Sequence, residues 1–211
     1  MGITCLVRWK NATGMRDFTY IAEHITKTLH GKNIGPWSLS FKVFRDVDST
    51  MNNNNNARQM TLKDSKLLYQ VSLAQQPRHV YCMVEGSVVV EAEKEMEIIL
   101  PRLKNLWQLR QNVTIEGTSY EIGDFTLRVA NILLGSAYKG LLLEIDYHPC
   151  STPNNARQLF QEFVESIVPS TAQLSCEYEY NYEQVGLSNY EFTIAHTSYQ
   201  YMQLFRNDGL F

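Results

Sequence analysis

The segment "LLLEIDYHP" places two carboxylates two positions apart, at Glu144 and Asp146. We predict that this segment is a strand, and residues i and i+2 of a strand lie on the same face of its sheet. Two carboxylates on one wall could bind Mg²⁺ or Mn²⁺, because hard cations prefer oxygen ligands. The alternative is that both acids lie on the solvent-exposed face of a half-buried strand.

A phosphohydrolase built on such acids would also need basic side chains in the same cavity to neutralise phosphate. Lys139 and Arg128 are the candidates for this task. Acids with the same spacing occur twice more, at Glu91 and Glu93 and at Glu177 and Glu179. A divalent-metal-dependent phosphohydrolase of the triphosphatase-tunnel type is therefore an alternative function, with Glu144 and Asp146 as metal ligands.

Other catalytic patterns are missing from the sequence. The five histidines show no H-E-x-x-H spacing, and His148 with Cys150 would supply too few ligands for a metal. The chain contains no G-x-S-x-G nucleophile turn and no phosphate-binding loop of the Walker type. We therefore predict no catalytic residues, no cofactor and no resident metal.

Tyrosine is unusually dense in the segment "LSCEYEYNYEQVGLSNYEF", where it occurs at Tyr178, Tyr180, Tyr182 and Tyr190. Tyrosine is favoured at interfaces because it buries a large area and keeps a polar end. Tyr180 and Tyr182 are our candidates for partner contact, with ordinary packing as the alternative. The segment could be a strand or a lid-like loop.

The composition is that of an ordinary globular chain. It has 211 residues, of which 44% are hydrophobic and 19% charged, and a net charge of −3. This charge argues against direct binding of nucleic acid, which calls for a basic surface. The four cysteines are widely spaced, as expected for free thiols. We find no secretory signal and no apolar run of about 20 residues, so we expect an intracellular, soluble protein that makes no membrane contact.

Several segments have the patterns of strands or helices. Strands are predicted at 2–9, 37–47, 66–74, 78–84, 87–93, 112–123, 124–135 and 139–149. Helices are predicted at 16–30, at 94–109 with a break at Pro101, and at 152–168. The asparagine-rich stretch at about 48–62 is predicted to be a flexible loop. We therefore expect one α+β domain over residues 1–211, with a single large antiparallel sheet closed or curled into a barrel and flanked by helices.

A last helix is predicted near the end of the chain. Thr197 and Gln200 have the spacing of a capping box. The apolar stripe of Tyr201, Leu204 and Phe205 is expected to pack on the sheet, with Gln200 on the opposite side. Two further side chains of this helix, Tyr199 and Met202, are candidates for partner contact.

The stretch "GTSYEIGDFTLRVANILLGSAYKGLLLEIDYHPC", residues 117–150, resembles the central signature of the Mediator complex subunit 20 family, in its fungal type. The opening "MGITC" and the closing "YQYMQLF" resemble the two ends of that family's sequence. The matching positions are Gly117, Tyr120, Asp124, Phe125, Val129, Gly135, Gly140, Glu144, Tyr147, Pro149 and Cys150. The chain departs from the pattern at Ala130, where the family has glycine, and at Asp146, where glutamate is commoner.

The resemblance implies a non-enzymatic subunit of the Mediator head module, in the nucleus. It implies a barrel with flanking helices that pairs directly with subunit 18. The carboxy-terminal helix of subunit 8 would join that pair to the rest of the head through subunit 18, and contact with RNA polymerase II would be indirect. The resemblance supplies no catalytic residues, although the family's barrel is similar to that of metal-dependent RNA triphosphatases.

Overall fold

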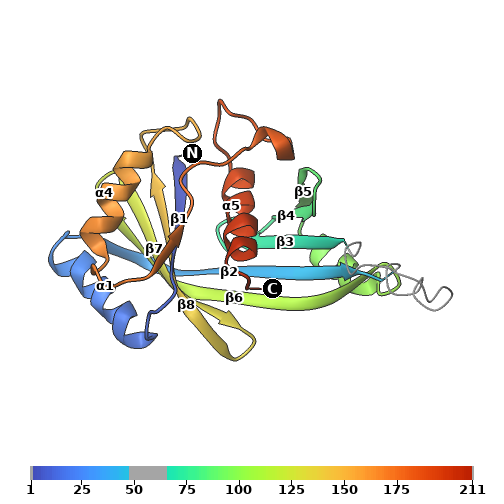
Figure 1. The fold of residues 1–211 in the computed structure, drawn as a ribbon, viewed down its shortest axis with the longest axis horizontal. Coiled ribbons are helices and arrows are strands. Elements are labelled where there is room, and N and C mark those ends of the chain that lie inside the picture. The colour runs from blue at the N-terminus through green and yellow to red at the C-terminus, as the bar shows by residue number, and fades with distance from the viewer. Residues whose placement is uncertain (1, 48–65, 211) are drawn as a thin grey trace.

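The computed structural model describes residues 2–47 and 66–210, so the loop predicted at about 48–62 lies outside the described residues. These residues form one antiparallel sheet in the order β5-β4-β3-β2-β6-β7-β8-β1-β9 (Figure 1). Its strands are β1 (Ile3–Trp9), β2 (Lys32–Asp46), β3 (Leu67–Leu73), β4 (His79–Val84), β5 (Val89–Glu93), β6 (Trp107–Ile122), β7 (Phe125–Leu134), β8 (Ala137–Tyr147) and β9 (Leu174–Cys176).

The sheet is curled rather than closed, because its edge strands β5 and β9 do not pair with each other. This confirms the predicted α+β fold with a single large antiparallel sheet. The long strands β2 and β6 pair from Lys32↔Glu121 to Asp46↔Trp107 and form the middle of the sheet. Strand β2 begins five residues earlier than the pattern from Trp37 onward predicted, since Lys32 and Asn33 already pair with β6.

Helices cover both faces of the sheet. They are α1 (Met15–Lys27), α3 (Met96–Ile99), α4 (Arg157–Ile167) and α5 (Ile194–Asn207), with 3₁₀ turns η2 (Leu100–Arg102) and η3 (Glu183–Val185). On β7, Phe125 stacks against Phe163 of α4, with ring centroids 4.2 Å apart. Neighbouring positions of a strand point to opposite faces. Phe125 and its partner Tyr147 therefore lie on one face, and the next pair, Thr126 and Asp146, lies on the other. Asp146 lies under α5, to which Thr4 connects it, so α4 and α5 pack on opposite faces of the sheet (Figure 1).

The segment predicted as one helix over 94–109 forms far less helix than its periodicity suggested. Helix α3 ends at Ile99, η2 follows at Leu100–Arg102, and Trp107 already belongs to β6. Pro101 explains the interruption, because proline cannot donate a backbone hydrogen bond and its ring clashes with the preceding turn.

Among the described residues, no helix has the length and apolar character to cross a membrane.

The tyrosine-rich segment combines both structures that its sequence left open. Its first residues form β9, which pairs with β1 from Val7↔Cys176 to Trp9↔Leu174. From Glu177 to Phe192 the chain is irregular except for η3. Asn154 fixes the course of this stretch, because its side chain both donates to the carbonyl of Tyr180 and accepts from its amide.

The C-terminal helix starts earlier than predicted. Its N-cap is Thr193, whose hydroxyl and amide both hydrogen-bond to the His196 ring. The predicted capping box of Thr197 and Gln200 is wrong, because both residues lie inside the helix and are buried. Gln200 therefore does not face solvent, and its amide donates to the carbonyl of Thr4 at 2.8 Å.

The apolar stripe of this helix packs on the sheet as predicted. Tyr201, Leu204 and Phe205 are all buried. Phe205 meets Phe41 of β2 edge to face, with centroids 5.2 Å apart and ring planes at 87°. Tyr201 packs beside Phe205 at 5.8 Å. The helix thus fills the concave side of the sheet with aromatic side chains.

Replacing Phe205 with alanine should therefore lower the free energy of unfolding by about 3–5 kcal/mol, through lost burial and the cavity left behind. Urea unfolding followed by circular dichroism would measure this. The neighbouring Arg206 is a matched control: it is exposed and pairs with Glu85, so Arg206→Ala should cost no more than about 1 kcal/mol. Equal effects of the two substitutions would contradict the observed packing.

Candidate functional site

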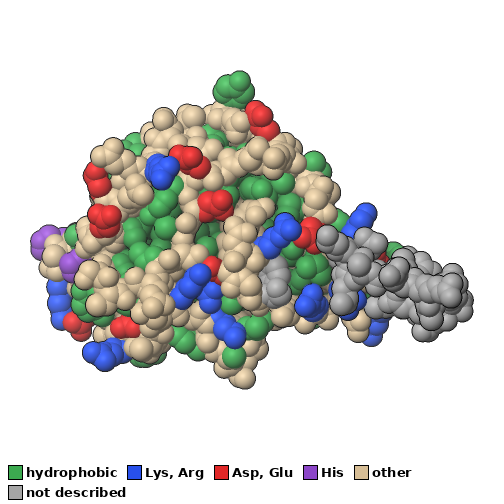
Figure 2. Space-filling view, viewed as in Figure 1, with side chains coloured by type: hydrophobic (Ala, Val, Ile, Leu, Met, Phe, Trp, Pro, Cys, Tyr) green, Lys and Arg blue, Asp and Glu red, His purple; other side chains and the backbone are tan. Residues whose placement is uncertain are grey.

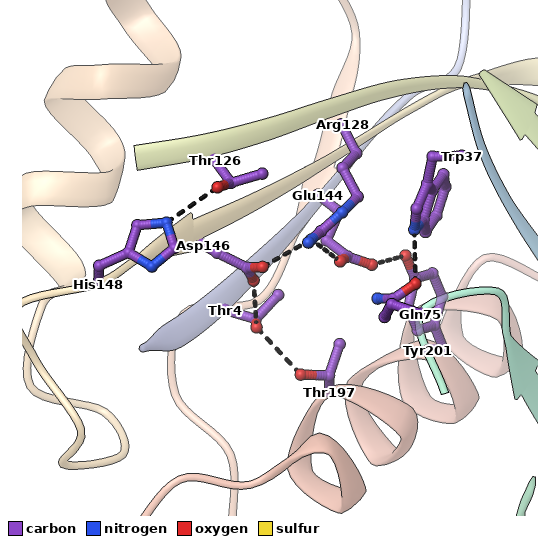
Figure 3. Close-up of polar contacts among 10 residues, drawn as sticks. All are labelled: Thr4, Trp37, Gln75, Thr126, Arg128, Glu144, Asp146, His148, Thr197 and Tyr201. Carbon is purple, nitrogen blue, oxygen red and sulfur yellow. Dashed lines mark hydrogen bonds and ion pairs between the residues drawn. The ribbon is translucent and has the colours of Figure 1, made fainter. Parts of the chain in front are cut away.

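Glu144 and Asp146 lie on one face of β8, as predicted, and Arg128 of β7 lies between them. The register that pairs Arg128 with Glu144 and Thr126 with Asp146 brings the guanidinium next to both acids. Its Nη1 donates to Glu144 Oε1 and, at 2.6 Å, to Asp146 Oδ2 (Figure 3). Arg128 was a candidate to neutralise phosphate, but in the structure it neutralises the protein's own carboxylates.

Helix α5 and strand β1 complete the site. The Tyr201 hydroxyl donates to Glu144 Oε2. The Thr4 hydroxyl donates to Asp146 Oδ1 at 2.6 Å and lies 3.0 Å from the Thr197 hydroxyl (Figure 3). Every carboxylate oxygen of the two acids therefore has a protein partner. We call Thr4, Arg128, Glu144, Asp146 and Tyr201 the Arg128 cluster.

The cluster is buried, and burial governs its electrostatics. The side chains of Glu144, Asp146 and Arg128 are 1%, 13% and 14% exposed. Burial, with a smaller effect from the charge of Asp146, raises the pKa of Glu144 to about 7 although Arg128 opposes the change. Burial and the nearby Glu144 hold the pKa of Tyr201 well above its usual range, so its hydroxyl stays a donor.

Contacts with neighbouring side chains surround the cluster. The Arg128 guanidinium carbon lies 5.9 Å from the centre of the Trp37 ring, within the range of a cation–π contact. The indole Nε1 of Trp37 donates to Gln75 Oε1 at 2.8 Å. Thr126, which pairs with Asp146 across the two strands, is hydrogen-bonded to the His148 ring at 2.9 Å (Figure 3). Side chains from both halves of the sheet therefore fix the guanidinium.

This geometry leaves the predicted metal ligands without free oxygens. The guanidinium occupies the position between the two carboxylates that a divalent cation would take. Within residues 2–47 and 66–210, no group of three or more histidine, cysteine, aspartate or glutamate side chains is arranged to hold a metal ion. The structure keeps Lys139 apart from the acids, where its carbonyl accepts hydrogen bonds from Arg8.

The other acid pairs serve surface contacts. Glu91 pairs with His79 at 3.1 Å, and Glu179 pairs with Arg157 at 3.1 Å, both with largely exposed side chains. Glu177 accepts a long hydrogen bond from Asn207. The fold does not bring these acids together with Glu144. The shared i, i+2 spacing of the acid pairs therefore did not indicate that they belong to one site.

The residues predicted to contact a partner are mostly interior. The described chain by itself buries Tyr180, Tyr182, Tyr199 and Met202, each at most 8% exposed. Tyr182 accepts a hydrogen bond from Gln200 and packs against Phe192 and Tyr199. A partner could use these four side chains only if the C-terminal segment moved, and their role in partner binding stays a prediction. Tyr190, in contrast, is 88% exposed.

One interaction was missed at the sequence level. Asp208, treated as part of a helix stop, has a side chain only 2% exposed and accepts from Arg8 at 2.9 Å and from Ser175 at 2.7 Å. Lys10 pairs with the same carboxylate at 2.6 Å. These contacts lower the pKa of Asp208 although burial acts in the opposite direction. The basic residues Arg8 and Lys10, at the end of β1, were the sequence feature that could have indicated ionic partners for Asp208.

Comparison with known proteins identifies related sequences. The family model described as "Med20: TATA-binding related factor (TRF) of subunit 20 of Mediator complex" matches residues 1–206. The Schizosaccharomyces pombe protein named Mediator of RNA polymerase II transcription subunit 20 is 32% identical over 145 residues, which cover 69% of this chain and 62% of that protein. The Homo sapiens protein of the same name is 23% identical over 211 residues, covering 97% and 93%.

Among solved structures, a chain of the Schizosaccharomyces pombe Mediator head module is similar, at 15% identity and a TM-score of 0.36. The match covers 81% of this chain and 96% of that one.

The raised pKa of Glu144 predicts a specific dependence of stability on pH. Folding raises this pKa from 4.5 to about 7, so the folded state holds the proton more tightly than the unfolded state. The resulting stabilisation is complete below about pH 4.5 and is lost as the pH rises to about 7. The stability of the wild type relative to Glu144→Gln should therefore fall by as much as about 3 kcal/mol between pH 4.5 and pH 8.

Urea titrations of both proteins across this range would measure the difference. Glu116 is exposed on β6, so Glu116→Gln is the control and should show no comparable trend. A difference between wild type and Glu144→Gln that does not change with pH would contradict the assignment. It would mean that folding does not shift the pKa of Glu144, because the charge of Arg128 offsets the effect of burial.

Removing the guanidinium should be costly. Arg128→Met leaves Glu144 and Asp146 buried without their shared cation, and breaking a buried pair in this way costs about 3–5 kcal/mol. Adding Glu144→Gln to that variant should restore part of the loss. Arg157→Met is the control, because its pair with Glu179 is more than half exposed and contributes at most about 1 kcal/mol. Thermal melts at pH 7 would rank the variants, and an Arg128→Met protein as stable as the control would disprove the cluster's structural role.

Proposed function

The chain belongs to the Mediator complex subunit 20 family, and from this membership we propose that it is a non-catalytic scaffold subunit of the Mediator head module. In this proposal it acts in the nucleus and pairs directly with subunit 18. The carboxy-terminal helix of subunit 8 joins that pair to the rest of the head through subunit 18. Its contribution to transcription by RNA polymerase II is then indirect, through the assembly.

The family match across residues 1–206 is the observation that carries this proposal. It extends from β1 through all but the last residue of α5, so it includes the sheet and the helix that fills its concave side. The relatives with this similarity are named as Mediator subunits, in organisms as distant as Schizosaccharomyces pombe and Homo sapiens. A Mediator subunit is thus the function class that accounts for the whole domain.

The Arg128 cluster supports a structural role. A catalytic metal site keeps an open coordination position for water or substrate, whereas Glu144 and Asp146 have all four oxygens engaged. The cluster also lies beneath α5, and Tyr201 covers Glu144 directly (Figure 3). A substrate phosphate could reach these acids only after α5 had left the sheet. The phosphohydrolase alternative therefore has no geometric support.

The net charge of −3 agrees with a role that does not involve the nucleic-acid backbone. Basic and acidic side chains are interspersed over the face that Figure 2 shows, with no continuous basic strip. Protein surfaces are thus the better candidates for recognition.

Co-expression with subunit 18 of the same organism, followed by size-exclusion chromatography with light scattering, tests the pairing. We expect a stable one-to-one complex, because the proposed scaffold role requires one. Each chain purified alone and then mixed serves as the control. Two chains that elute separately would contradict pairing, and phosphate release from a nucleoside triphosphate with Mn²⁺ that Glu144→Gln abolished would contradict the non-catalytic role.

A further inference from the structure

The segment from α3 to the start of β6 exposes an unusual number of large aliphatic side chains. The exposed side chains are Ile98 (57%), Ile99 (45%), Leu103 (38%), Leu106 (50%) and Leu109 (49%). Exposed apolar residues scattered singly are normal, but a contiguous group marks an interaction site. These five fall within twelve consecutive positions of the chain.

The local fold keeps this segment compact and directs these side chains outward. The amide of Leu103 donates to the carbonyl of Ile99, and the amides of Leu106 and Trp107 donate to the carbonyl of Leu103. The inward side of the segment is already used, because Leu100 packs with Phe44 and Leu68 in a small second core. The exposed aliphatics are therefore what remains after the segment has packed on its own sheet.

The charge of residues 98–110 is one-sided. They contain Arg102, Lys104 and Arg110 and no acid, and Glu97, just before them in α3, is already paired with Lys94. All three basic side chains belong to exposed residues. None of the ion pairs formed within the described part of the chain includes them. Basic side chains are visible at the right-hand end of the face in Figure 2, where β2 and β6 end (Figure 1).

We propose that this surface, the basic apolar patch, docks an acidic amphipathic segment of a partner protein. The patch consists of Ile98, Ile99, Leu103, Leu106 and Leu109 together with Arg102, Lys104 and Arg110. A helix with leucines on one face and carboxylates beside them would bury its apolar face on the aliphatics and pair its acids with the cations. The charge complementarity favours this occupant over a basic or purely apolar one. The proposal does not depend on the pairing with subunit 18.

Fluorescence anisotropy with the full-length chain tests the docking. The probe is a labelled synthetic peptide of about 15 residues, long enough for an isolated helix to form in part, with leucines at positions i, i+3, i+4 and i+7 and glutamates elsewhere. The control peptide carries lysine at every glutamate. We expect the acidic peptide to bind at least about tenfold more tightly, a difference of about 1.4 kcal/mol, and to weaken as salt is raised.

Two double variants separate the contributions of charge and apolar contact. Arg102→Glu with Lys104→Glu, and Leu103→Ser with Leu106→Ser, should each weaken acidic-peptide binding at least about tenfold. All four residues are exposed, so both variants should fold, which circular dichroism would check. The matched control is Met15→Ser with Arg16→Glu, an exposed apolar and basic pair at the start of α1 that should bind like the wild type.

Three results would overturn the proposal. Equal affinity for the acidic and basic peptides would remove the charge argument. Binding unchanged in both patch variants would place the peptide elsewhere on the chain. A dimer in light scattering that Leu103→Ser with Leu106→Ser disperses would show that a second copy of this chain covers the patch instead.

Discussion

Helix α5 connects the two ends of a sheet whose edge strands, β5 and β9, are not paired with each other. It contacts β1, next to one edge of the sheet, and β3 and β5 at the other. A curled sheet without this helix would expose the aromatic and aliphatic side chains of its concave face, including Phe41. The bonds from Arg8 and Lys10 to Asp208 fix the far end of the helix against β1. The shape of the whole domain therefore depends on the seating of one C-terminal helix.

The Arg128 cluster adds a positional constraint to this apolar contact. Buried ion pairs seldom increase stability over well-packed apolar residues, because removing charges from water is costly. Their geometry is nevertheless demanding, and here it joins Thr4 of β1, Arg128 of β7, Glu144 of β8 and Tyr201 of α5. A one-residue slip between β7 and β8 would turn Arg128 to the face covered by α1 and α4, where no carboxylate pairs with it. We infer that the cluster selects one register and one helix position.

The sequence predicted those parts of the structure that follow from local periodicity. Alternation identified most strands, and it placed Glu144 and Asp146 on one face of β8. It could not identify Arg128 as their partner, because that contact depends on the pairing register of two strands. The same limit applies to Gln200, whose spacing resembled a solvent-facing cap residue. Its amide instead finds Thr4 and Tyr182 in the interior, and local pattern carries no information about such distant partners.

The failure of the predicted helix over 94–109 has a consequence for the surface. An uninterrupted helix of that length would have gathered its aliphatic side chains into one stripe facing the sheet. Pro101 prevents this, and the segment instead places Leu100 inward and Ile98, Ile99 and Leu103 outward. Burying large aliphatic side chains is worth about 1.5–3 kcal/mol each, and this chain leaves much of that contribution unused. The docking proposed for the basic apolar patch would use this exposed apolar surface, which the core of the chain leaves uncovered.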